Sequence, residues 1–178
     1  MIVRALLVNG TVGSGKTTVG AAVATELAAR GEPVAFVDLD TLSEFWPAPV
    51  DDPFNTRIVA TNLASVAKNF GEAGATALVM AGVVETTPGL ASYQRAVGVP
   101  LVVVRLVAPR EVIDARLRRR HAEHDAAGLE WHLARVAELD ASLDGSGVPM
   151  RLVPNEASPQ QVAVAVLDAC GWGTGGPA

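Results

Sequence analysis

A glycine-rich segment near the N-terminus constrains this chain more than any other feature. Residues 10–17 read GTVGSGKT and match the pattern G-x-x-x-x-G-K-[ST]. An apolar, strand-length run precedes this segment, and apolar residues at helical spacing follow it. Gly10, Gly13 and Gly15 allow the backbone to curl, so that successive N–H groups point into the loop near a helix N-terminus. The sequence therefore predicts a strand, an anion-binding loop and a helix in direct succession.

The side chains of this loop fit a nucleoside triphosphate with Mg²⁺. Lys16 can reach the β- and γ-phosphates as a point charge, and the Thr17 hydroxyl can coordinate Mg²⁺. Ser14 belongs to the phosphate-binding loop, and we expect Thr18 to contact the α-phosphate. A glycine-rich turn without a ligand would explain neither Lys16 nor Thr17. Because the sequence has no N-K-x-D stretch of the kind that reads guanine, we expect ATP and Mg²⁺ as the cofactors.

Strand-like and helix-like segments alternate along the chain. The strands are predicted at residues 2–9, 33–40, 75–84, 100–106 and 150–153. The helices are predicted at 15–30, 53–70 with Asp52 as N-cap, 90–97, from 109 onward, 129–143 after a break at Gly128, and from Ser158 to Cys170. This alternation predicts an α/β fold with a five-stranded parallel sheet and helices on both faces. We expect one domain over residues 1–172 and a flexible tail at 173–178.

Composition excludes several classes of partner. The formal net charge of -5 argues against a broad electrostatic grip on nucleic acid. No segment reaches the roughly 20 uninterrupted apolar residues that cross a bilayer, so no membrane association is expected. A single cysteine, Cys170, permits no intramolecular disulfide and no cysteine-based zinc site. A cytoplasmic location fits these features best.

Two carboxylates follow the second predicted strand. Asp38 and Asp40 are two positions apart, so strand alternation would place their side chains on one side, at the strand end where open α/β sheets bind ligands. We expect both to face the crevice beside the glycine-rich loop. In the alternative interpretation one of them, Asp40 more readily than Asp38, only caps the following loop. Glu85, just past the third strand, is a candidate second magnesium ligand or substrate carboxylate.

Arginines crowd into one short part of the chain. Five of them lie within residues 110–120, while much of the remaining chain is acidic or neutral. Neighbouring helix positions differ by about 100° of rotation, so at most two of these arginines reach one ligand. Arg116 and Arg120 share a face at i,i+4 spacing and are the candidates. The alternative for each is a solvated basic helix face.

Four features of the sequence occur together in one known group of enzymes. They are the loop at residues 10–18, the Asp38-Leu39-Asp40 stretch, the arginine-rich segment, and Val153-Pro154-Asn155 before Ser158. The chain resembles the small P-loop kinases related to nucleoside monophosphate kinases, shikimate kinase, gluconate kinase, adenylylsulfate kinase and chloramphenicol phosphotransferase. The resemblance implies a three-layer P-loop NTPase fold with strand order 2-3-1-4-5 and a mobile lid near residues 114–130.

The same resemblance implies roles for individual residues. Asp38 would hold Mg²⁺ directly or through water, and Asp40 would orient or deprotonate the acceptor hydroxyl. A lid arginine, Arg116 or Arg120, would neutralise charge on the transferring phosphoryl group. The loop that contains Asn155 would lie beside the adenine. Arg57 stands where related kinases place an acceptor-binding arginine.

These expectations converge on phosphoryl transfer. We expect an enzyme that moves the γ-phosphate of ATP to a hydroxyl or phosphate of a small-molecule acceptor. The third predicted strand lacks the terminal aspartate of mechanical ATPases, so the metal-side carboxylate must come from Asp38. Two alternatives stay open: a regulatory ATPase with a protein partner, and a phosphotransferase acting on an antibiotic or a cell-wall precursor. The sequence names neither the acceptor nor the oligomeric state.

Overall fold

The protein folds around one parallel sheet. A computed structural model describes residues 1–121 and 125–173. The strands are β1 (Arg4–Asn9), β2 (Val34–Asp38), β3 (Ala77–Ala81), β4 (Leu101–Val107) and β5 (Arg151–Pro154). The helices are α1 (Lys16–Ala29), a 3₁₀ turn η1 (Asp40–Leu42), α2 (Thr56–Glu72), α3 (Thr87–Val97), α4 (Arg110–Arg120), α5 (Ala126–Gly145) and α6 (Pro159–Cys170). The predicted α/β fold is confirmed.

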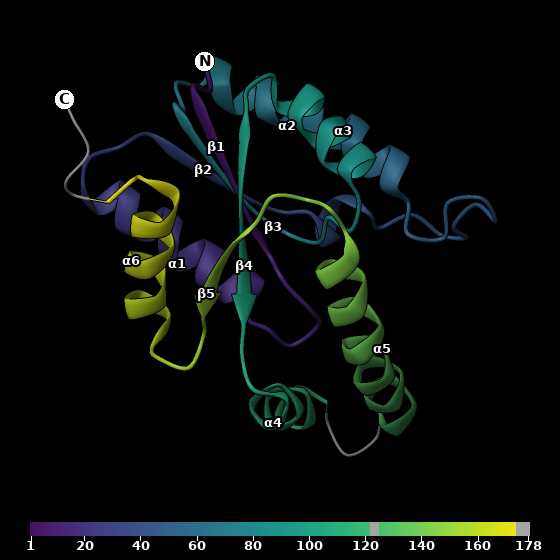
Figure 1. Cartoon of the computed structure of the whole chain (residues 1–178). Helices are drawn as coiled ribbons and strands as arrows, with labels where there is room; N and C mark the ends of the chain where they lie inside the picture. Colours follow the sequence, from purple (N-terminus) through teal and green to yellow (C-terminus); the bar gives the residue numbers. More distant parts are fainter. Residues whose placement is uncertain (122–124, 174–178) are drawn as a thin grey trace.

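The strand order explains where the glycine-rich loop lies. The sheet has the order β2-β3-β1-β4-β5, as the resemblance implied. All pairs are parallel, and the central strand β1 pairs with β3 and β4, with Leu6 opposite both Val79 and Val102. All five strands therefore end at the same edge, and the loop after β1 emerges at its middle (Figure 1).

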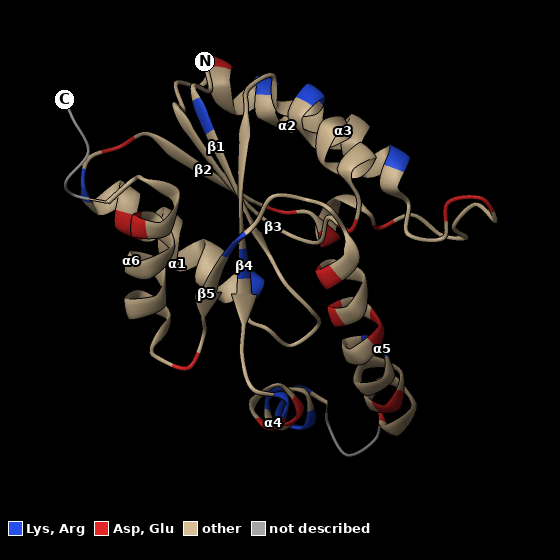
Figure 2. Ribbon diagram, viewed as in Figure 1, with Lys and Arg blue, Asp and Glu red and all other residues tan. Residues whose placement is uncertain are grey.

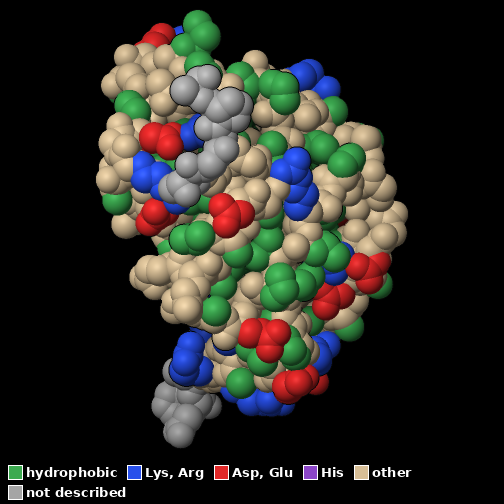
Figure 3. Space-filling model, turned by 60° about the vertical axis from the view of Figure 1, so that its left-hand side comes forward, with side chains coloured by type: hydrophobic (Ala, Val, Ile, Leu, Met, Phe, Trp, Pro, Cys, Tyr) green, Lys and Arg blue, Asp and Glu red, His purple; other side chains and the backbone are tan. Residues whose placement is uncertain are grey.

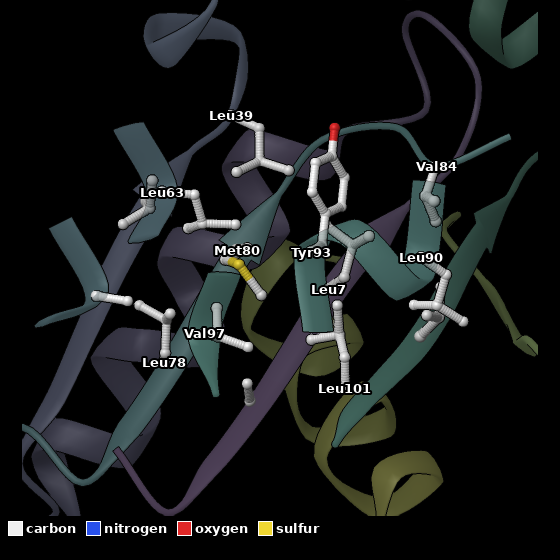
Figure 4. Close-up of a cluster of buried hydrophobic side chains, with 14 of the residues drawn as sticks. Leu7, Leu39, Leu63, Leu78, Met80, Val84, Leu90, Tyr93, Val97 and Leu101 are labelled. Carbon is white, nitrogen blue, oxygen red and sulfur yellow. The ribbon is translucent and has the colours of Figure 1, made fainter. Parts of the chain in front are cut away.

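Two hydrophobic layers cover the sheet. Figure 1 shows α1 and α6 on one face and α2 and α3 on the other, while α4 lies below the carboxyl edge beside α5. On the α2 and α3 face, Leu7, Leu63 and Met80 belong to one buried cluster (Figure 4). On the other face, Leu6 and Val23 belong to a second. Alternate residues of β1 thus point into opposite layers, as expected for a strand buried on both sides.

The start of α2 differs from the prediction. Asp52 is not the N-cap, because the helix begins at Thr56 and Asn55, with φ of 54°, precedes it. The Asp52 carboxylate nevertheless accepts hydrogen bonds from the backbone N–H groups of Thr56 at 2.8 Å and Arg57 at 3.0 Å. Asp52 therefore satisfies the first N–H groups of the helix from outside it, across a turn that contains Pro53.

The start of α5 also differs. The predicted break at Gly128 is wrong, because Gly128 lies in the first turn of α5. Asp125 is the N-cap, and its side chain accepts a hydrogen bond from the Gly128 N–H at 3.1 Å. A Cβ at Gly128 would stand 2.5 Å from the Asp125 carboxylate, so this glycine serves close approach of the cap.

Two predicted segments are only partly described. The expected lid, 114–130, includes the last part of α4 and the first turn of α5, but residues 122–124 lie outside the described part of the chain. Residues 174–178 of the expected tail also lie outside it. Among the helices of residues 1–121 and 125–173, none combines the length and the apolar character needed to cross a membrane.

Charge is spread over the surface in small groups. On the face shown in Figure 3, Lys and Arg side chains lie between Asp and Glu side chains and form no continuous basic area. Acidic side chains recur along α5 and at the tip of the segment between η1 and α2 (Figure 2).

Candidate active site

The loop between β1 and α1 has the backbone conformation that its glycines predict. Gly10 has φ of 145°, and Gly15, the N-cap of α1, has φ of 92°. A Cβ at Gly10 would stand 2.9 Å from the Leu106 carbonyl oxygen, and one at Gly15 would stand 2.6 Å from the Asn155 amide nitrogen. Both positions therefore require glycine for conformation and for space. The loop leads directly into the N-terminus of α1, a favourable place for phosphate.

Lys16 lies at the start of α1 and is partly buried. Its Nζ donates to the Thr11 carbonyl oxygen at 3.0 Å, which folds the side chain back over the loop. Burial lowers the pKa of Lys16, while the charges of Asp40 and Asp38 oppose this shift. An anion bound in the loop would favour the charged lysine, so the site is suited to a phosphate group.

Thr17 and Asp38 form the pair that could hold a metal ion. The Thr17 hydroxyl donates to Asp38 Oδ2 at 2.7 Å, so two oxygen ligands lie side by side next to the loop. Within the described residues, no cluster of three or more His, Cys, Asp or Glu side chains is arranged to hold a metal ion. Mg²⁺ in nucleotide sites takes few protein ligands and completes its shell with phosphates and water. The pair therefore fits Mg²⁺ delivered with a nucleotide.

Asp38 and Asp40 both reach the crevice, but not by strand alternation as predicted. β2 ends at Asp38, and Asp40 is the first residue of η1. Asp38 Oδ1 accepts the Asp40 N–H at 3.0 Å, so Asp38 holds the turn. In the described part of the protein the Asp40 carboxylate accepts no hydrogen bond. The loop-capping role expected more readily for Asp40 thus belongs to Asp38.

The surroundings of Asp40 raise the pKa of its carboxyl group, although the residue is exposed. Loss of surrounding water raises the pKa of Asp40, and Asp38 raises it further, while Lys16 and Arg120 oppose the shift. A raised pKa makes a carboxylate a better proton acceptor near neutral pH. The Asp40 carboxylate thus accepts no hydrogen bond within the described residues and is suited to receive a proton.

Arg116 and Asn155 join α4 and the loop after β5 to the phosphate-binding loop. Arg116 Nη2 donates to the Asn155 carbonyl oxygen at 2.8 Å, and the Asn155 side-chain amide donates to the Ser14 carbonyl oxygen at 2.6 Å. Arg116 Nη1 is buried and has no hydrogen-bond partner among the described residues. An unsatisfied buried cationic donor beside the loop is what a nucleotide phosphate would pair with.

Two cavities open at the carboxyl edge of the sheet. The first, of about 760 Å³, we call the nucleotide cavity; it is lined by the phosphate-binding loop and by Asp38, Arg116 and Asn155, with Thr18 also on its wall. The second, of about 960 Å³, we call the aromatic cavity, because Trp46, Phe54, Tyr93 and Trp131 line it. Asp40 and Arg120 line both cavities. They therefore mark the junction at which a group could pass from one ligand to another.

The remaining predicted residues lie on the aromatic cavity. Arg57 lines it but is tied to Asp51 by two hydrogen bonds of 2.9 and 3.0 Å. Glu85 lines it too and is paired with Arg135 at 2.9 Å. Glu85 does not line the nucleotide cavity, so its position favours an acceptor-side role over a second magnesium ligand.

Sequence reasoning missed the contribution of α5. The residues of α5 that line the aromatic cavity include Trp131, Arg135, Leu139 and Ser142, which lie on one helix face. The spacing of Trp131 and Arg135 was a detectable signal, but the partner of that face depends on the fold. Tyr93 was missed for the same reason: it reads as an ordinary core residue of α3.

The fold and the loop together define the class of small P-loop kinase-like proteins. A family model described as an AAA domain, AAA_33, matches residues 6–145. The chain belongs to this AAA_33 family of P-loop proteins. No curated protein sequence matches it.

Solved structures share the fold at low sequence identity. A gluconokinase from Sinorhizobium meliloti 1021 is 20% identical, with a TM-score of 0.59, over 94% of this chain and 93% of that one. The Mycobacterium tuberculosis APS kinase CysC, in complex with AMPPNP and APS, is 20% identical, with a TM-score of 0.62, over 94% and 96%. A Deinococcus radiodurans tunicamycin resistance protein is 17% identical, with a TM-score of 0.57, over 98% and 99%. The predicted resemblance of the chain to the small P-loop kinases is thereby confirmed.

Proposed function

We propose that this protein is an ATP-dependent phosphotransferase that moves the γ-phosphate of ATP to a hydroxyl group of a small molecule. One observation carries the proposal: the nucleotide cavity and the aromatic cavity meet at Asp40 and Arg120. A protein that only bound a nucleotide would need no second cavity opening onto the position of its terminal phosphate. A base and a cation at such a junction are the groups that phosphoryl transfer requires.

Each residue of the nucleotide cavity has a role in this proposal. The loop N–H groups and Lys16 hold the β- and γ-phosphates, Thr18 contacts the α-phosphate, and Asn155 lies beside the adenine. Thr17 and Asp38 hold Mg²⁺, which neutralises phosphate charge when bound. Their 2.7 Å contact supports this assignment.

Transfer then needs a proton acceptor and a stabilised phosphoryl group. The acceptor oxygen forms a bond to the terminal phosphorus, the bond from that phosphorus to the bridging oxygen breaks, and ADP leaves. The proton of the acceptor hydroxyl passes to the Asp40 carboxylate, whose freedom from other hydrogen bonds supports this role. Arg120 at the junction, with Arg116 on the nucleotide side, stabilises the charge on the transferred group.

The named ligands of similar structures are compatible with this reading. The APS kinase structure holds AMPPNP together with APS, and an Acinetobacter baumannii shikimate kinase structure holds shikimate. These proteins pair a nucleotide with a small acceptor on the same fold. We extend that pairing to this chain as part of the proposal, together with a cytoplasmic location and the absence of nucleic acid partners.

The test is ADP formation by the purified protein with ATP and Mg²⁺, screened over a panel of alcohols, sugars, nucleosides and antibiotics. The proposal predicts that one group of compounds stimulates ADP formation and that omission of Mg²⁺ abolishes it. Uniformly slow ADP formation with intact ATP binding would contradict it.

A second candidate function has its own observation. Phe45, Trp46, Val50 and Phe54 are large apolar side chains that are more than half exposed on the segment before α2. Such a segment suits a regulatory ATPase that binds a protein partner. Stimulation by a protein and by no small molecule would favour this candidate.

A further inference from the structure

Two of the three arginines that line the aromatic cavity are already paired. Arg135 Nη2 contacts Glu85 Oε1 at 2.9 Å, and both side chains are largely shielded, at 20% and 29% exposure. Arg57 makes two hydrogen bonds to the Asp51 carboxylate and lies 3.5 Å from Asp52 Oδ2. Within the described residues both arginines already have a carboxylate partner, and the Arg135 pair is the more shielded of the two, since the Arg57 and Asp51 side chains are 64% and 71% exposed.

The third arginine of this cavity lies at its edge. Arg120 lines both cavities, and no ion pair to it occurs in the described part of the chain. At the junction it stands where a transferring phosphoryl group would pass, so it is committed to that group. Among the described residues deeper in the aromatic cavity, Glu85, Arg135 and Arg57 are already paired, so a carboxylate or phosphate there would have to separate one of these pairs. Separating the partly buried Glu85–Arg135 pair costs free energy, because it leaves the Glu85 carboxylate without its partner.

Charge around the cavity points the same way. Figure 2 shows acidic side chains along α5 and at the tip of the segment before α2, the two elements that flank the cavity. Asp40 adds a carboxylate at the junction. Several of these carboxylates are paired, Asp51 with Arg57 and Glu138 with Arg135, so the flanking elements offer an anionic acceptor no unpaired cation among the described residues.

The lining of the aromatic cavity is suited to a mainly apolar ligand. Trp46, Phe54 and Trp131 line it and are 76%, 57% and 56% exposed, although aromatic side chains of this size are usually covered. Covering them with an apolar ligand would be favourable. A volume of about 960 Å³ holds a molecule of the size of a typical drug.

Tyr93 supplies a neutral polar group. Its ring is buried with the aliphatic cluster, while its hydroxyl points away from that cluster (Figure 4). Tyr93 lines the aromatic cavity, and burial raises the pKa of its hydroxyl to about 12, so that it stays protonated at physiological pH. It offers a hydrogen bond without charge.

We infer that the acceptor is an alcohol without a carboxylate or phosphate group, and that the rest of the molecule is mainly apolar and of the size of an aromatic group. The Glu85–Arg135 ion pair then excludes anionic acceptors. The inference rests on the proposed function, since it names the substrate class of the same site. It separates this protein from the fold relatives whose structures hold APS or shikimate, because both of those ligands are anions.

A matched pair of probes tests the inference by binding alone. The probes are 4-phenylbenzyl alcohol and its analogue with a carboxylate on the distal ring. Calorimetry with the full chain, Mg²⁺ and AMPPNP measures each affinity, and the fluorescence of Trp46 and Trp131 reports the same event. We expect the alcohol to bind at least about tenfold more tightly than the carboxylate. Equal binding, tighter binding of the carboxylate, or no binding of the alcohol at millimolar concentration overturns the inference.

Two variants test the role of the ion pair. Glu85→Gln releases Arg135, whose other partner, Glu138, is exposed and lies at 3.4 Å, so the preference for the alcohol should shrink about tenfold. Arg135→Gln leaves Glu85 unpaired and should widen the preference. Lys68→Gln, on an exposed pair of α2 away from the cavity lining, is the matched control and should change nothing. If the preference for the alcohol over the carboxylate is the same in both cavity variants as in the wild type, the Glu85–Arg135 pair does not determine which acceptor binds.

Transfer of phosphate to the probes, measured separately with ATP, distinguishes failure of the proposed function from failure of the inference about the acceptor. Binding of the alcohol without its phosphorylation contradicts the proposed function and leaves the cavity assignment intact. Phosphorylation of anionic acceptors in preference to neutral ones supports the kinase and overturns the inference. Stimulation of ATP turnover by a protein alone overturns both.

Discussion

The nucleotide cavity and the aromatic cavity are built in different ways. The nucleotide cavity is centred on one continuous loop whose backbone N–H groups are placed to bind phosphate, with a single lysine and a Thr17–Asp38 pair added. The aromatic cavity is assembled from side chains of several elements, namely η1, the segment before α2, α2 itself, the loop after β3, α3, the end of α4 and α5. In the proposed function, backbone groups of one loop bind the nucleotide, and side chains from separate elements can vary to fit the particular acceptor.

The largest effect should come from the junction between the two cavities. Asp40→Asn removes the proton acceptor, so acceptor phosphorylation should fall about 10²- to 10⁴-fold while ATP affinity is retained. Steady-state kinetics with the best acceptor, alongside calorimetry with AMPPNP, measures both quantities. A variant that kept full transfer activity would show that Asp40 serves neither cavity.

Lys16→Ala should damage the nucleotide cavity alone. Loss of its charge removes stabilisation of the β- and γ-phosphates and should lower turnover about 10²- to 10³-fold with any acceptor. Affinity for the neutral probe in the aromatic cavity, measured without nucleotide, should not change. If probe affinity fell equally, the two cavities would not be separable sites.

Arg120→Gln and Arg116→Gln measure the separate contributions of an arginine that lines both cavities and of one that lines the nucleotide cavity alone. Arg120 lines both, so its loss should lower kcat about 10²-fold. Arg116 lines only the nucleotide cavity and donates to the Asn155 carbonyl oxygen, so its loss should mainly raise the KM for ATP and lower kcat less than the loss of Arg120 does. The reverse pattern would exchange the roles of the two arginines.

Gly15→Ala tests the backbone character of the nucleotide cavity. Its φ of 92° strains any other residue, and a Cβ there would stand 2.6 Å from the Asn155 amide nitrogen. We expect a loss of about 1–3 kcal/mol in the free energy of unfolding, with weaker ATP binding. Chemical denaturation of this variant beside Gly31→Ala, whose Cβ meets nothing within 4 Å, separates the contact from the strain of φ.

The smallest effect concerns pH and Asp40. Because loss of surrounding water raises the pKa of Asp40 in the folded protein above its ordinary 3.8, ionisation costs stability. Relative to Asp40→Asn, the wild type should therefore lose stability as the pH rises from about 3.8 through the raised pKa, and no further above it. Urea denaturation without nucleotide over this range measures the difference. A gain of relative stability with pH would mean that Lys16 outweighs the loss of water.

The sequence predicted the features that depend on neighbours along the chain. The loop around Lys16 and the alternation of strands and helices were read correctly because each has a local pattern, and the strand order followed from the resemblance. Asp38 and Asp40 were placed at the right edge for a partly wrong reason, since β2 ends before Asp40. Capping by Asp52 was misread because Asn55 adopts a left-handed conformation between it and the helix.

What the sequence could not supply depends on contacts between distant segments. The Glu85–Arg135 pair joins residues 50 positions apart, and no sequence pattern near either residue predicts its partner. Tyr93 lines a cavity only because the fold brings α3 and the segment before α2 to the same cavity. Substrate selection is thus a property of the assembled fold, whereas phosphate binding is a property of one segment.

The destination of the terminal phosphate decides whether this protein is a phosphotransferase. The purified protein is incubated with Mg²⁺, ATP labelled in the γ-phosphate, and the neutral alcohol probe or the best alcohol from the acceptor panel. We expect the label to appear on the alcohol oxygen and Asp40→Asn to lower this transfer about 10²- to 10⁴-fold. Release of the label only as inorganic phosphate, at the same rate with and without the alcohol, would contradict this expectation.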